Sequence, residues 1–389
     1  MQVTRFDVII VGGGLAGLAL ACALRDTRLK IALVEQRPPH PAPGWDARVY
    51  AVSPANADFL QTIGIWKHLP AERMAPISAM KVVGDGGARL DFSAYAAGLP
   101  ELGWILESSL MACELWENVK RQSNVTLLCP ATPAKLEMGT ASALLTLTDG
   151  RTLAASLLVG ADGRDSWTRT ALGLRAHVTA YDEMGVVANF ECQTPHRGIA
   201  RQWFRRDGVL AWLPLAGNRI SIVWSTPVEN ARALLALPAE ELCSRVAAAG
   251  ECELGPFTLL TPATAFPLRL VRVPQIVAPR LALLGDAAHG IHPLSGHGIN
   301  LGYQDARTLA ELLAARPEWQ DIGSERLLKA YQRQRREETL LMQATTHALH
   351  HLFQQDFPGF RTLRNLGMNL TNALPVVKNM LVRYATGAF

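Results

Sequence analysis

The first patterned segment of the chain is a strand, turn, helix and strand in that order. Phe6 to Val11 is a continuous apolar run, which is typical of a parallel strand buried on both faces. A glycine turn and an apolar helix follow, and a second apolar run extends from Lys30 to Val34. This order predicts a βαβ unit of an α/β domain over residues 6–36.

The pattern changes over residues 181–266. Short apolar runs alternate with turn-forming residues, which predicts an antiparallel meander with strands at 185–192, 199–204, 209–215 and 219–225. A glycine-containing piece at 76–98 is expected to add a hairpin to this sheet. Aromatic residues in the meander either fill the core of the sheet or form one wall of a substrate cavity, and we expect about half of them to line the cavity: Trp203, Phe204, Trp212 and Trp224.

The last part of the chain has a helical pattern. Leu309, Leu312 and Leu313 continue one helix, and 327–343 forms another. Apolar residues then recur at helical spacing, with arginines between them and Pro375 as a break: Phe360, Leu363, Leu366, Leu370 and Leu374. Such a segment either docks onto the protein body or contacts an anionic membrane surface or a partner protein.

Composition limits the class of protein. The chain has 389 residues, 49% hydrophobic and 19% charged, which indicates a folded protein of more than one domain. Its net charge of +4 is too small to indicate nucleic-acid binding. No acidic residue follows Asp356, whereas four basic residues do, so the tail carries the whole excess: Arg361, Arg364, Lys378 and Arg383.

Cysteine usage and the apolar N-terminus bear on location. The six cysteines show no pairing motif, which is typical of a reducing cytosol. The uncharged stretch from Val8 to Leu24 is 17 residues long, too short for a transmembrane helix, and no cleavage site follows it. We therefore expect a cytoplasmic protein, either free or peripheral at the inner face of the membrane.

The N-terminal glycines have the spacing of a dinucleotide-binding turn. Gly12, Gly14 and Gly17 match G-x-G-x-x-G, and with Leu15 and Ala16 they lie where a helix N-terminus would meet a pyrophosphate. Glu35 ends the second strand 18 residues after Gly17, where a carboxylate can accept hydrogen bonds from ribose hydroxyls. The pattern fits either NAD or FAD.

Residues 285–302, GDAAHGIHPLSGHGINLG, contain three histidines: His289, His292 and His297. Prolines and glycines interrupt any helix here, so the histidines would not share one face. No second cluster of acids and histidines supports them as metal ligands, and we expect no metal.

This segment instead resembles the second flavin-binding motif of the FAD-dependent aromatic hydroxylases, the fold group of para-hydroxybenzoate hydroxylase. LLVGADGRDSWTR, residues 157–169, resembles their Asp-Gly motif. The likeness covers essentially the whole chain. It is greatest to the ubiquinone-biosynthesis hydroxylases, through 199–225, 266–268 and 292–306.

The resemblance implies roles for individual residues. Asp286, after Gly285, would bind the ribityl chain of FAD, Arg48 its phosphates, and Asp162 and Glu107 would lie near the cofactor. Backbone N–H groups at the start of a helix would stabilise negative charge on the flavin; they belong to Gly296, Gly298, Ile299 and Asn300. The candidates beside the reacting part of the flavin are Pro293, His297 and Gly298. Relatives usually have Ala and Gln where this chain has Ser295 and His297, and the histidine is either a titrating group or a tolerated substitution.

The expected fold is α/β, with a Rossmann-like FAD-binding domain, an antiparallel β-sheet substrate domain and a C-terminal helical region. The FAD-binding domain would comprise 1–75, 99–180 and 267–345, the substrate domain 76–98 and 181–266, and the helical segment 346–389. No second glycine-rich βαβ unit occurs, so NAD(P)H would bind transiently.

The expected function is FAD-dependent hydroxylation of a polyprenylated phenol in ubiquinone biosynthesis with NAD(P)H and dioxygen. The alternatives are a hydroxylase of another phenol, a flavoprotein reductase, or a subunit of a biosynthetic complex or homo-oligomer.

Overall fold

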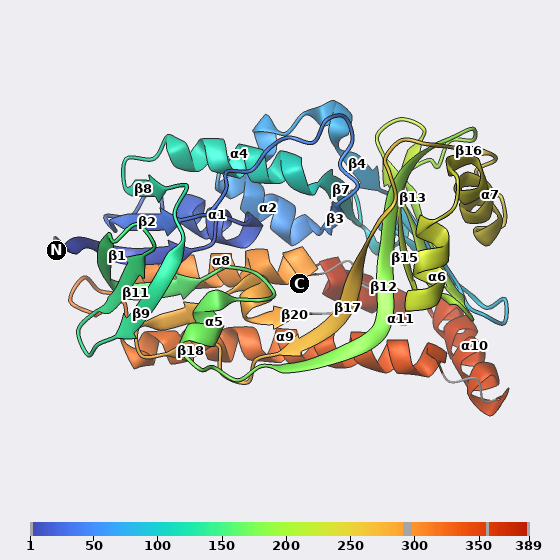
Figure 1. Ribbon diagram of the computed structural model, residues 1–389. Helices are drawn as coiled ribbons and strands as arrows, with labels where there is room; N and C mark the ends of the chain where they lie inside the picture. The colour runs from blue at the N-terminus through green and yellow to red at the C-terminus, as the bar shows by residue number, and fades with distance from the viewer. Residues whose placement is uncertain (1–2, 291–297, 355–357, 387–389) are drawn as a thin grey trace.

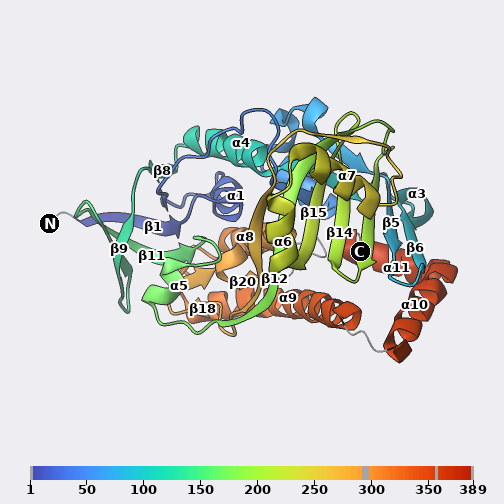
Figure 2. The ribbon, with the colours of Figure 1, turned by 45° about the vertical axis from the view of Figure 1, so that its right-hand side comes forward.

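The computed structural model describes residues 3–290, 298–354 and 358–386 (Figure 1). One half of the molecule is a mainly parallel sheet with helices packed on it. The other half is a larger, mainly antiparallel sheet, and long strands and a long helix run between the two (Figures 1 and 2). This arrangement confirms the expected α/β class with a second β-sheet unit.

The first sheet has the order β18-β19-β11-β1-β2-β8. Its parallel strands are β1 (Val3–Val11), β2 (Ile31–Val34), β8 (Val125–Leu128), β11 (Thr152–Gly160) and β19 (Leu281–Leu283). Antiparallel strands extend it: β9 (Pro133–Met138), β10 (Ala143–Leu147) and β18 (Val277–Ala278). Both neighbours of β1 are parallel to it, as the continuous apolar run predicted.

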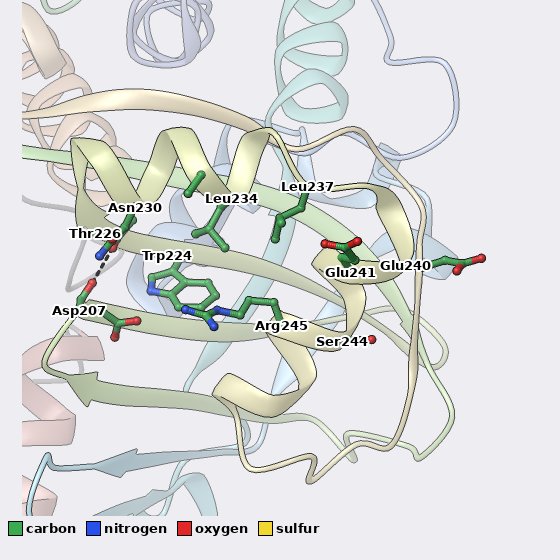
Figure 3. Close-up of a pocket in the computed structure, with 11 residues that line it drawn as sticks. Asp207, Trp224, Thr226, Asn230, Leu234, Leu237, Glu240, Glu241, Ser244 and Arg245 are labelled. Carbon is green, nitrogen blue, oxygen red and sulfur yellow. Dashed lines mark hydrogen bonds between the residues drawn. The ribbon is translucent and has the colours of Figure 1, made fainter.

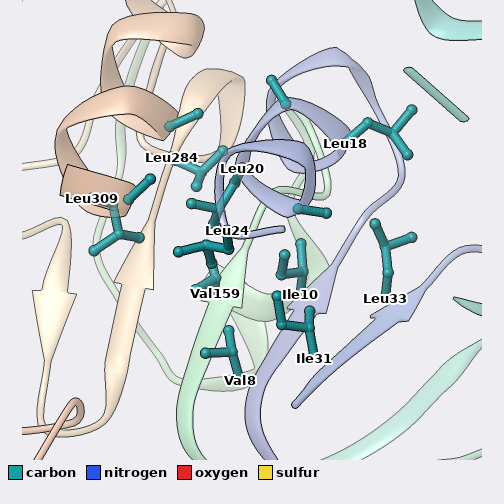
Figure 4. Packing of buried hydrophobic residues seen from close by; sticks show 14 of the residues in the cluster. Val8, Ile10, Leu18, Leu20, Leu24, Ile31, Leu33, Val159, Leu284 and Leu309 are labelled. Atoms are coloured by element: carbon teal, nitrogen blue, oxygen red, sulfur yellow. The ribbon is translucent and has the colours of Figure 1, made fainter. Parts of the chain in front are cut away.

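Helices pack on this sheet and bury its apolar residues. They are α1 (Leu15–Ala23), α2 (Pro54–Thr62), α4 (Ser108–Lys120), α5 (Trp167–Ala171) and α8 (Gly298–Ala315). Figure 4 shows side chains of β1, β2 and β11 meeting Leu18, Leu20 and Leu24, with Leu284 and Leu309 closing the same core. These residues are almost wholly excluded from water, so the core fixes where the glycine turn after β1 lies.

The second sheet has the order β20-β17-β12-β15-β14-β13-β5-β6, with β16 beside β12. Its strands are β5 (Ala79–Val83), β6 (Arg89–Ser93), β12 (His177–Cys192), β13 (Ile199–Arg205), β14 (Gly208–Leu215), β15 (Arg219–Pro227), β16 (Phe257–Leu259), β17 (Thr264–Arg272) and β20 (His289–Gly290). Helices α6 (Val228–Leu235) and α7 (Ala239–Ala249) cover one face. The predicted strands of the meander and the predicted 76–98 hairpin are all present.

A three-stranded sheet lies between the halves, with β7 (Gly103–Glu107) paired to both β3 (Val49–Val52) and β4 (Ala75–Ile77). Short helical turns complete this region: η1 (Trp66–His68), η2 (Ala71–Arg73), η3 (Gly285–Ala287) and α3 (Ala94–Ala97). The expected domain boundaries at 180 and 266 fall inside β12 and β17, which pair with each other over most of their length. The two halves are therefore joined by continuous strands.

The tail consists of α9 (Glu325–Gln354), α10 (Pro358–Ala373) and α11 (Pro375–Thr386). Helix α9 is longer than its predicted 327–343 core, and the expected boundary at 346 lies inside it. Pro375 ends one helix and begins the next, as expected. Among the described residues, no helix combines the length and the apolar character needed to cross a bilayer.

Candidate active site

The first glycine turn is closed on one side and open on the other. Gly12 has φ +108°, and a Cβ built on it would lie 2.4 Å from the carbonyl oxygen of Ala161. A Cβ on Gly17 would lie 2.1 Å from the carbonyl oxygen of Gly12. Gly14 has no such neighbour within 4 Å and is the N-cap of α1, with no side chain capping the helix. The free N–H groups of α1 therefore face open space, the geometry that a pyrophosphate requires.

The two glycine-bearing motifs meet in space although about 270 residues separate them. A Cβ built on Gly285 would lie 3.2 Å from the Cβ of Ala16, and one built on Gly302 would lie 3.3 Å from it. Only small residues allow α1 and α8 to approach so closely. The N-terminal turn and the 285–302 segment therefore border one site.

Glu35 lies at the end of β2 beneath the first turn. Its Oε2 accepts a hydrogen bond from the N–H of Gly13 at 2.5 Å, and Oε1 accepts from the N–H groups of Gln36 and Arg37. The carboxylate thus fixes the turn and lies beside the face where an adenosine ribose would bind. Its contact with ribose hydroxyls stays a prediction.

Arg48, Tyr50 and Asp286 gather where β3 approaches η3. The guanidinium carbon of Arg48 lies 5.5 Å from the centre of the Tyr50 ring, and the Asp286 charge acts on both. Burial raises the pKa of Tyr50, so its hydroxyl stays neutral at physiological pH. The structure therefore brings together Arg48 and Asp286, the residues expected at the phosphates and the ribityl chain. Tyr50 is a neighbour that sequence reasoning missed.

Glu107 does not offer a free carboxylate to a cofactor. It is 1% exposed, and Arg73 binds both of its oxygens, at 2.8 Å through Nε and at 2.6 Å through Nη2. The N–H of Asp46 also donates to Oε2 at 2.6 Å. These donors already satisfy the carboxylate, and the expected place of Glu107 near the cofactor stays a prediction. Glu107 holds the loop that leads to Arg48.

Asp162 is likewise bound within its own loop. It accepts hydrogen bonds from Ser166 Oγ at 2.5 Å and from the N–H of Thr168 at 2.8 Å, which ties it to the start of α5. The backbone of Asp162 lies against Gly12, beside the first turn. The backbone of Asp162 therefore lies where the cofactor is predicted to bind, while its side chain holds the loop before α5 in place.

The start of α8 is anchored by Asn300. Its Oδ1 accepts from the N–H of Ser53 at 3.0 Å and from Asn56 Nδ2 at 2.9 Å, and its Nδ2 donates to the carbonyl of Ala51 at 2.8 Å. Ser53 is the N-cap residue of α2 and Pro54 its first residue, but Ser53 Oγ accepts from Asn56 Nδ2 and not from a helix N–H. The first turn of α8 is thus fixed to the β3–α2 segment.

Gly298 begins α8, and a Cβ built on it would meet no atom within 4 Å among the described residues. Ile299 packs against the core of the first half. Pro293, Gly296 and His297 lie outside the described residues. The described end of the helix thus presents backbone N–H groups, which can stabilise an anion.

His289 belongs to a buried ionic network behind this site. Its Nε2 lies 2.6 Å from Asp305 Oδ2, and Arg335 Nε donates to Asp305 Oδ1 at 2.7 Å. The N–H of Gly285 also donates to Asp305 Oδ2 at 2.9 Å. Burial favours the neutral imidazole, but the adjacent carboxylate raises the pKa of His289. Burial likewise opposes ionisation of Asp305, but the two cations lower its pKa.

The network joins η3, α8 and α9 at the residue before Asp286. Within the described residues no group of three or more histidine, cysteine, aspartate or glutamate side chains could hold a metal ion.

The large sheet presents a different face to the site than the aromatic pattern suggested. Trp203, Trp212 and Trp224 all belong to the core beneath α6 and α7. Figure 3 shows Trp224 under Leu234 and Leu237, in a pocket of about 670 Å³ between the sheet and these helices. Phe204 alone of the four points the other way, because it stacks on Phe353 of α9 with ring centres 3.7 Å apart. We expected about half of these four aromatic residues to line the substrate cavity, but the three tryptophans lie in the core on the other side of the sheet.

Beside Phe204, the opposite face of the sheet carries a row of smaller side chains. Val187, Val223 and Ala211 form one cross-strand row, which Gln202 extends. This face lies toward the first half, because Asn189 Nδ2 donates to the carbonyl of Asp46 at 2.8 Å. A substrate between the halves would thus meet a wall of aliphatic side chains together with the amides of Gln202 and Asn189.

These features fit a dinucleotide with a redox-active ring. The N-terminus of α1 opens beside Gly14, α8 packs against both α1 and η3, and Asp286 of η3 lies close enough to act on the guanidinium of Arg48. No metal is required by this arrangement, and the charges suit a phosphate-containing ligand.

Comparisons with known proteins agree with this geometry. The family model described as FAD binding domain matches residues 5–345. The ubiquinone hydroxylase UbiL of Rhodospirillum rubrum is 37% identical over 386 residues, covering 98% of this chain and 89% of the relative. The 3-demethoxyubiquinol 3-hydroxylase of Escherichia coli is 32% identical over 385 residues, covering 98% of each chain.

Among solved structures, a probable FAD-dependent monooxygenase of Pseudomonas aeruginosa, pqsL, superposes with a TM-score of 0.79 at 23% identity. The match covers 94% of this chain and 99% of that one, and it supports the fold. With a family model matched over most of its length and relatives above 30% identity along nearly all of it, the chain belongs to the FAD-dependent hydroxylases, the family that includes the ubiquinone hydroxylases.

Proposed function

We propose that this protein is an FAD-dependent monooxygenase that hydroxylates the aromatic ring of a polyprenylated phenol in ubiquinone biosynthesis, using NAD(P)H and dioxygen. The observation that carries the proposal is the meeting of the two glycine-bearing motifs at Ala16, Gly285 and Gly302. The relatives named as ubiquinone hydroxylases support the choice of substrate class.

The residues around the site would bind the parts of one FAD. The N-terminus of α1 would hold the pyrophosphate beside Gly14, and Glu35 would accept hydrogen bonds from the ribose. Asp286 would bind the ribityl hydroxyls, and Arg48 would lie over the phosphates. The start of α8 would face the ring, where its N–H groups favour the anionic reduced form.

Bound FAD supplies the redox chemistry by which one atom of dioxygen enters the ring and the other leaves as water, with NAD(P)H as reductant. The protein contributes position and environment. The aliphatic row of Val187, Val223 and Ala211 would exclude water from the ring of the substrate and suit a prenyl chain. Pro293 and His297, beside the reacting part of the flavin by resemblance, stay predictions.

The direct test is a reaction with purified holoenzyme, NADPH and a polyprenylated phenol in detergent. Hydroxylation requires NADPH consumption, oxygen consumption and hydroxylated product in a 1:1:1 ratio. NADPH oxidation that continues without oxygen and reduces another acceptor would indicate a reductase. A flavin that NADPH never reduces would indicate a subunit of a complex.

Quinone profiling of cells that lack the protein identifies the substrate independently. The proposal expects one polyprenylated phenol to accumulate and ubiquinone to fall, and the accumulated compound also gives the ring position. An unchanged quinone profile, together with hydroxylation of a phenol without a prenyl chain, would assign the enzyme to another pathway.

A further inference from the structure

Helix α10 is attached to the protein through polar side chains. Asn365, Asn369 and Asn372 lie at helical spacing on one face, and each accepts a hydrogen bond through Oδ1 from a backbone N–H of the β5–β6 hairpin. The donors are Gly86 at 3.2 Å, Arg89 at 3.2 Å and Asp91 at 3.1 Å. The protein-facing side of this helix is therefore made of amides.

An ion pair strengthens this attachment. Arg364 binds Asp85 in the hairpin turn, and the two side chains are only 2% and 9% exposed. Figures 1 and 2 both place α10 at the far edge of the large sheet, beside β6. Docking onto the protein body, one of the two interpretations of the sequence, is thus confirmed for this face of α10.

Among the described residues of α10 and α11, several large apolar side chains are exposed. On α10, Leu366 is 62% exposed and Leu370 is 59% exposed. On α11, which packs against α10, Val376 is 81% exposed and Met380 is 68% exposed. We call this surface the C-terminal apolar face: Leu366, Leu370, Leu374, Val376, Val377, Met380 and Leu381.

Helix α10 thus reverses the usual arrangement. A surface helix of a water-soluble domain buries its leucines and exposes its amides, whereas in the described part of α10 Leu366 and Leu370 are exposed and three asparagines bind the hairpin. Large apolar side chains exposed this close together along α10 and α11 are typical of a site that contacts another apolar phase. The hairpin already satisfies the amides, so the leucines are left for a second contact.

The charge of the C-terminal segment favours one kind of partner for this second contact. Residues 357–389 contain no acidic residue. Two cations lie on α11: Arg383 is exposed, whereas Lys378 is half-buried and its Nζ donates to Asn372 Oδ1 at 3.1 Å. A second copy of the chain would bring two cationic segments together, which is unfavourable. An anionic phospholipid surface offers apolar tails for the leucines and headgroup phosphates for the cations.

We propose that the C-terminal apolar face lies on an anionic phospholipid bilayer, with α10 and α11 in the interfacial plane and the β5–β6 hairpin above them. Membrane contact of this face does not depend on catalysis. The role that we give to this contact rests on the proposed function, because a polyprenylated phenol resides in lipid and the enzyme would bind it there. In this proposal one face of α10 docks onto the protein body and the other contacts an anionic membrane.

The test is flotation of the purified FAD-bound full chain with vesicles, without NADPH or substrate. Vesicles of phosphatidylglycerol and phosphatidylcholine are compared with vesicles of phosphatidylcholine alone. We expect binding to the anionic vesicles that weakens when salt is raised, because screening shortens the reach of the charges. The variant Leu366→Ser/Leu370→Ser/Met380→Ser should lose at least tenfold in partition coefficient.

A matched control carries three serines at exposed apolar residues elsewhere, Val178→Ser/Leu235→Ser/Trp319→Ser, and should bind as the unaltered chain does. The variant Lys378→Gln/Arg383→Gln should lose the preference for anionic vesicles, at about fivefold per cation. Flavin content and thermal unfolding establish that each variant is folded.

Equal binding by the unaltered chain and the leucine variant would overturn the proposal, as would absence of binding to anionic vesicles. A dimer that sediments as such and dissociates in the leucine variant, with no vesicle binding, would assign this face to a second copy and also overturn it. Failure to hydroxylate any polyprenylated phenol would remove the proposed function but leave the vesicle result unchanged. The two failures are therefore distinguishable.

Discussion

Replacing Asp305 by asparagine should destabilise the protein by about 3 kcal/mol, the lower end of the range for breaking a buried ion pair. Asp305 is 0% exposed, and the change leaves His289 and Arg335, at 3% and 4% exposure, without their shared anion. Arg335 keeps Glu338 as a second partner, which limits the loss. The measurement is the free energy of unfolding in urea with FAD in excess.

The dependence of this loss on pH tests the cause. The pKa of His289 is raised in the folded protein, so the stabilisation is complete below the unfolded value, about 6.5, and is lost as pH rises through the folded value. In the variant, burial without the carboxylate disfavours the imidazolium, and stability should instead fall as pH decreases below about 6.5. The difference between wild type and variant should therefore shrink from pH 6 to pH 8.

Glu311→Gln provides a control on the same helix. Its pair with Arg307 is solvent-exposed, so the loss should be within about 0.5 kcal/mol and should not vary in this way with pH. A loss below about 1 kcal/mol for Asp305→Asn, or a difference that grows with pH, would refute the assigned network. Flavin release measured in parallel reports whether the turn before Asp286 loosens.

Three further predictions concern the cofactor and the sheet. Gly14→Val should yield a folded protein with little bound FAD by its absorbance spectrum, because the added side chain enters open space where a ligand would lie; full flavin content would contradict this. Asp286→Ala should also be purified with little FAD, since a charged acceptor contributes roughly 1.5–3 kcal/mol, and undiminished flavin titration would exclude its assigned role. Trp212→Ala should lower the free energy of unfolding by about 3–5 kcal/mol while leaving KM for the substrate unchanged, since Trp212 faces α6 and α7; a large rise in KM in a folded variant would place it at the substrate.

The sequence predicted those parts of the structure whose signals are local. Gly12, Gly14 and Gly17 lie between two apolar runs, and this pattern indicated the turn and the helix N-terminus that the structure shows. The strands of the meander were also visible because turn formers separate them.

The side of the sheet to which side chains point was harder to predict from the sequence. Trp203, Trp212 and Trp224 lie on three different strands, so only the pairing register shows that they share a face, and only the position of α6 and α7 shows which side of the sheet is covered. Partners distant in sequence were missed for the same reason. Arg73 gives no sign in the sequence that it binds Glu107, and Asp305 is marked only as a charge among apolar residues of a helix.

The order of strands in the first sheet has a consequence for biosynthesis. Strand β1 begins at Val3 but pairs with β11, whose first partner residue is Thr152, and β11 pairs in turn with β19 at residues 281–283. At the speed of translation, β11 is synthesised roughly 8–30 s after β1, and α8 is synthesised later still. Until β11 is synthesised, the edge of β1 that pairs with it is exposed, which favours aggregation and binding by chaperones. The residues expected to bind FAD extend from Gly12 to Asn300, so the cofactor site is complete only when most of the chain has been translated.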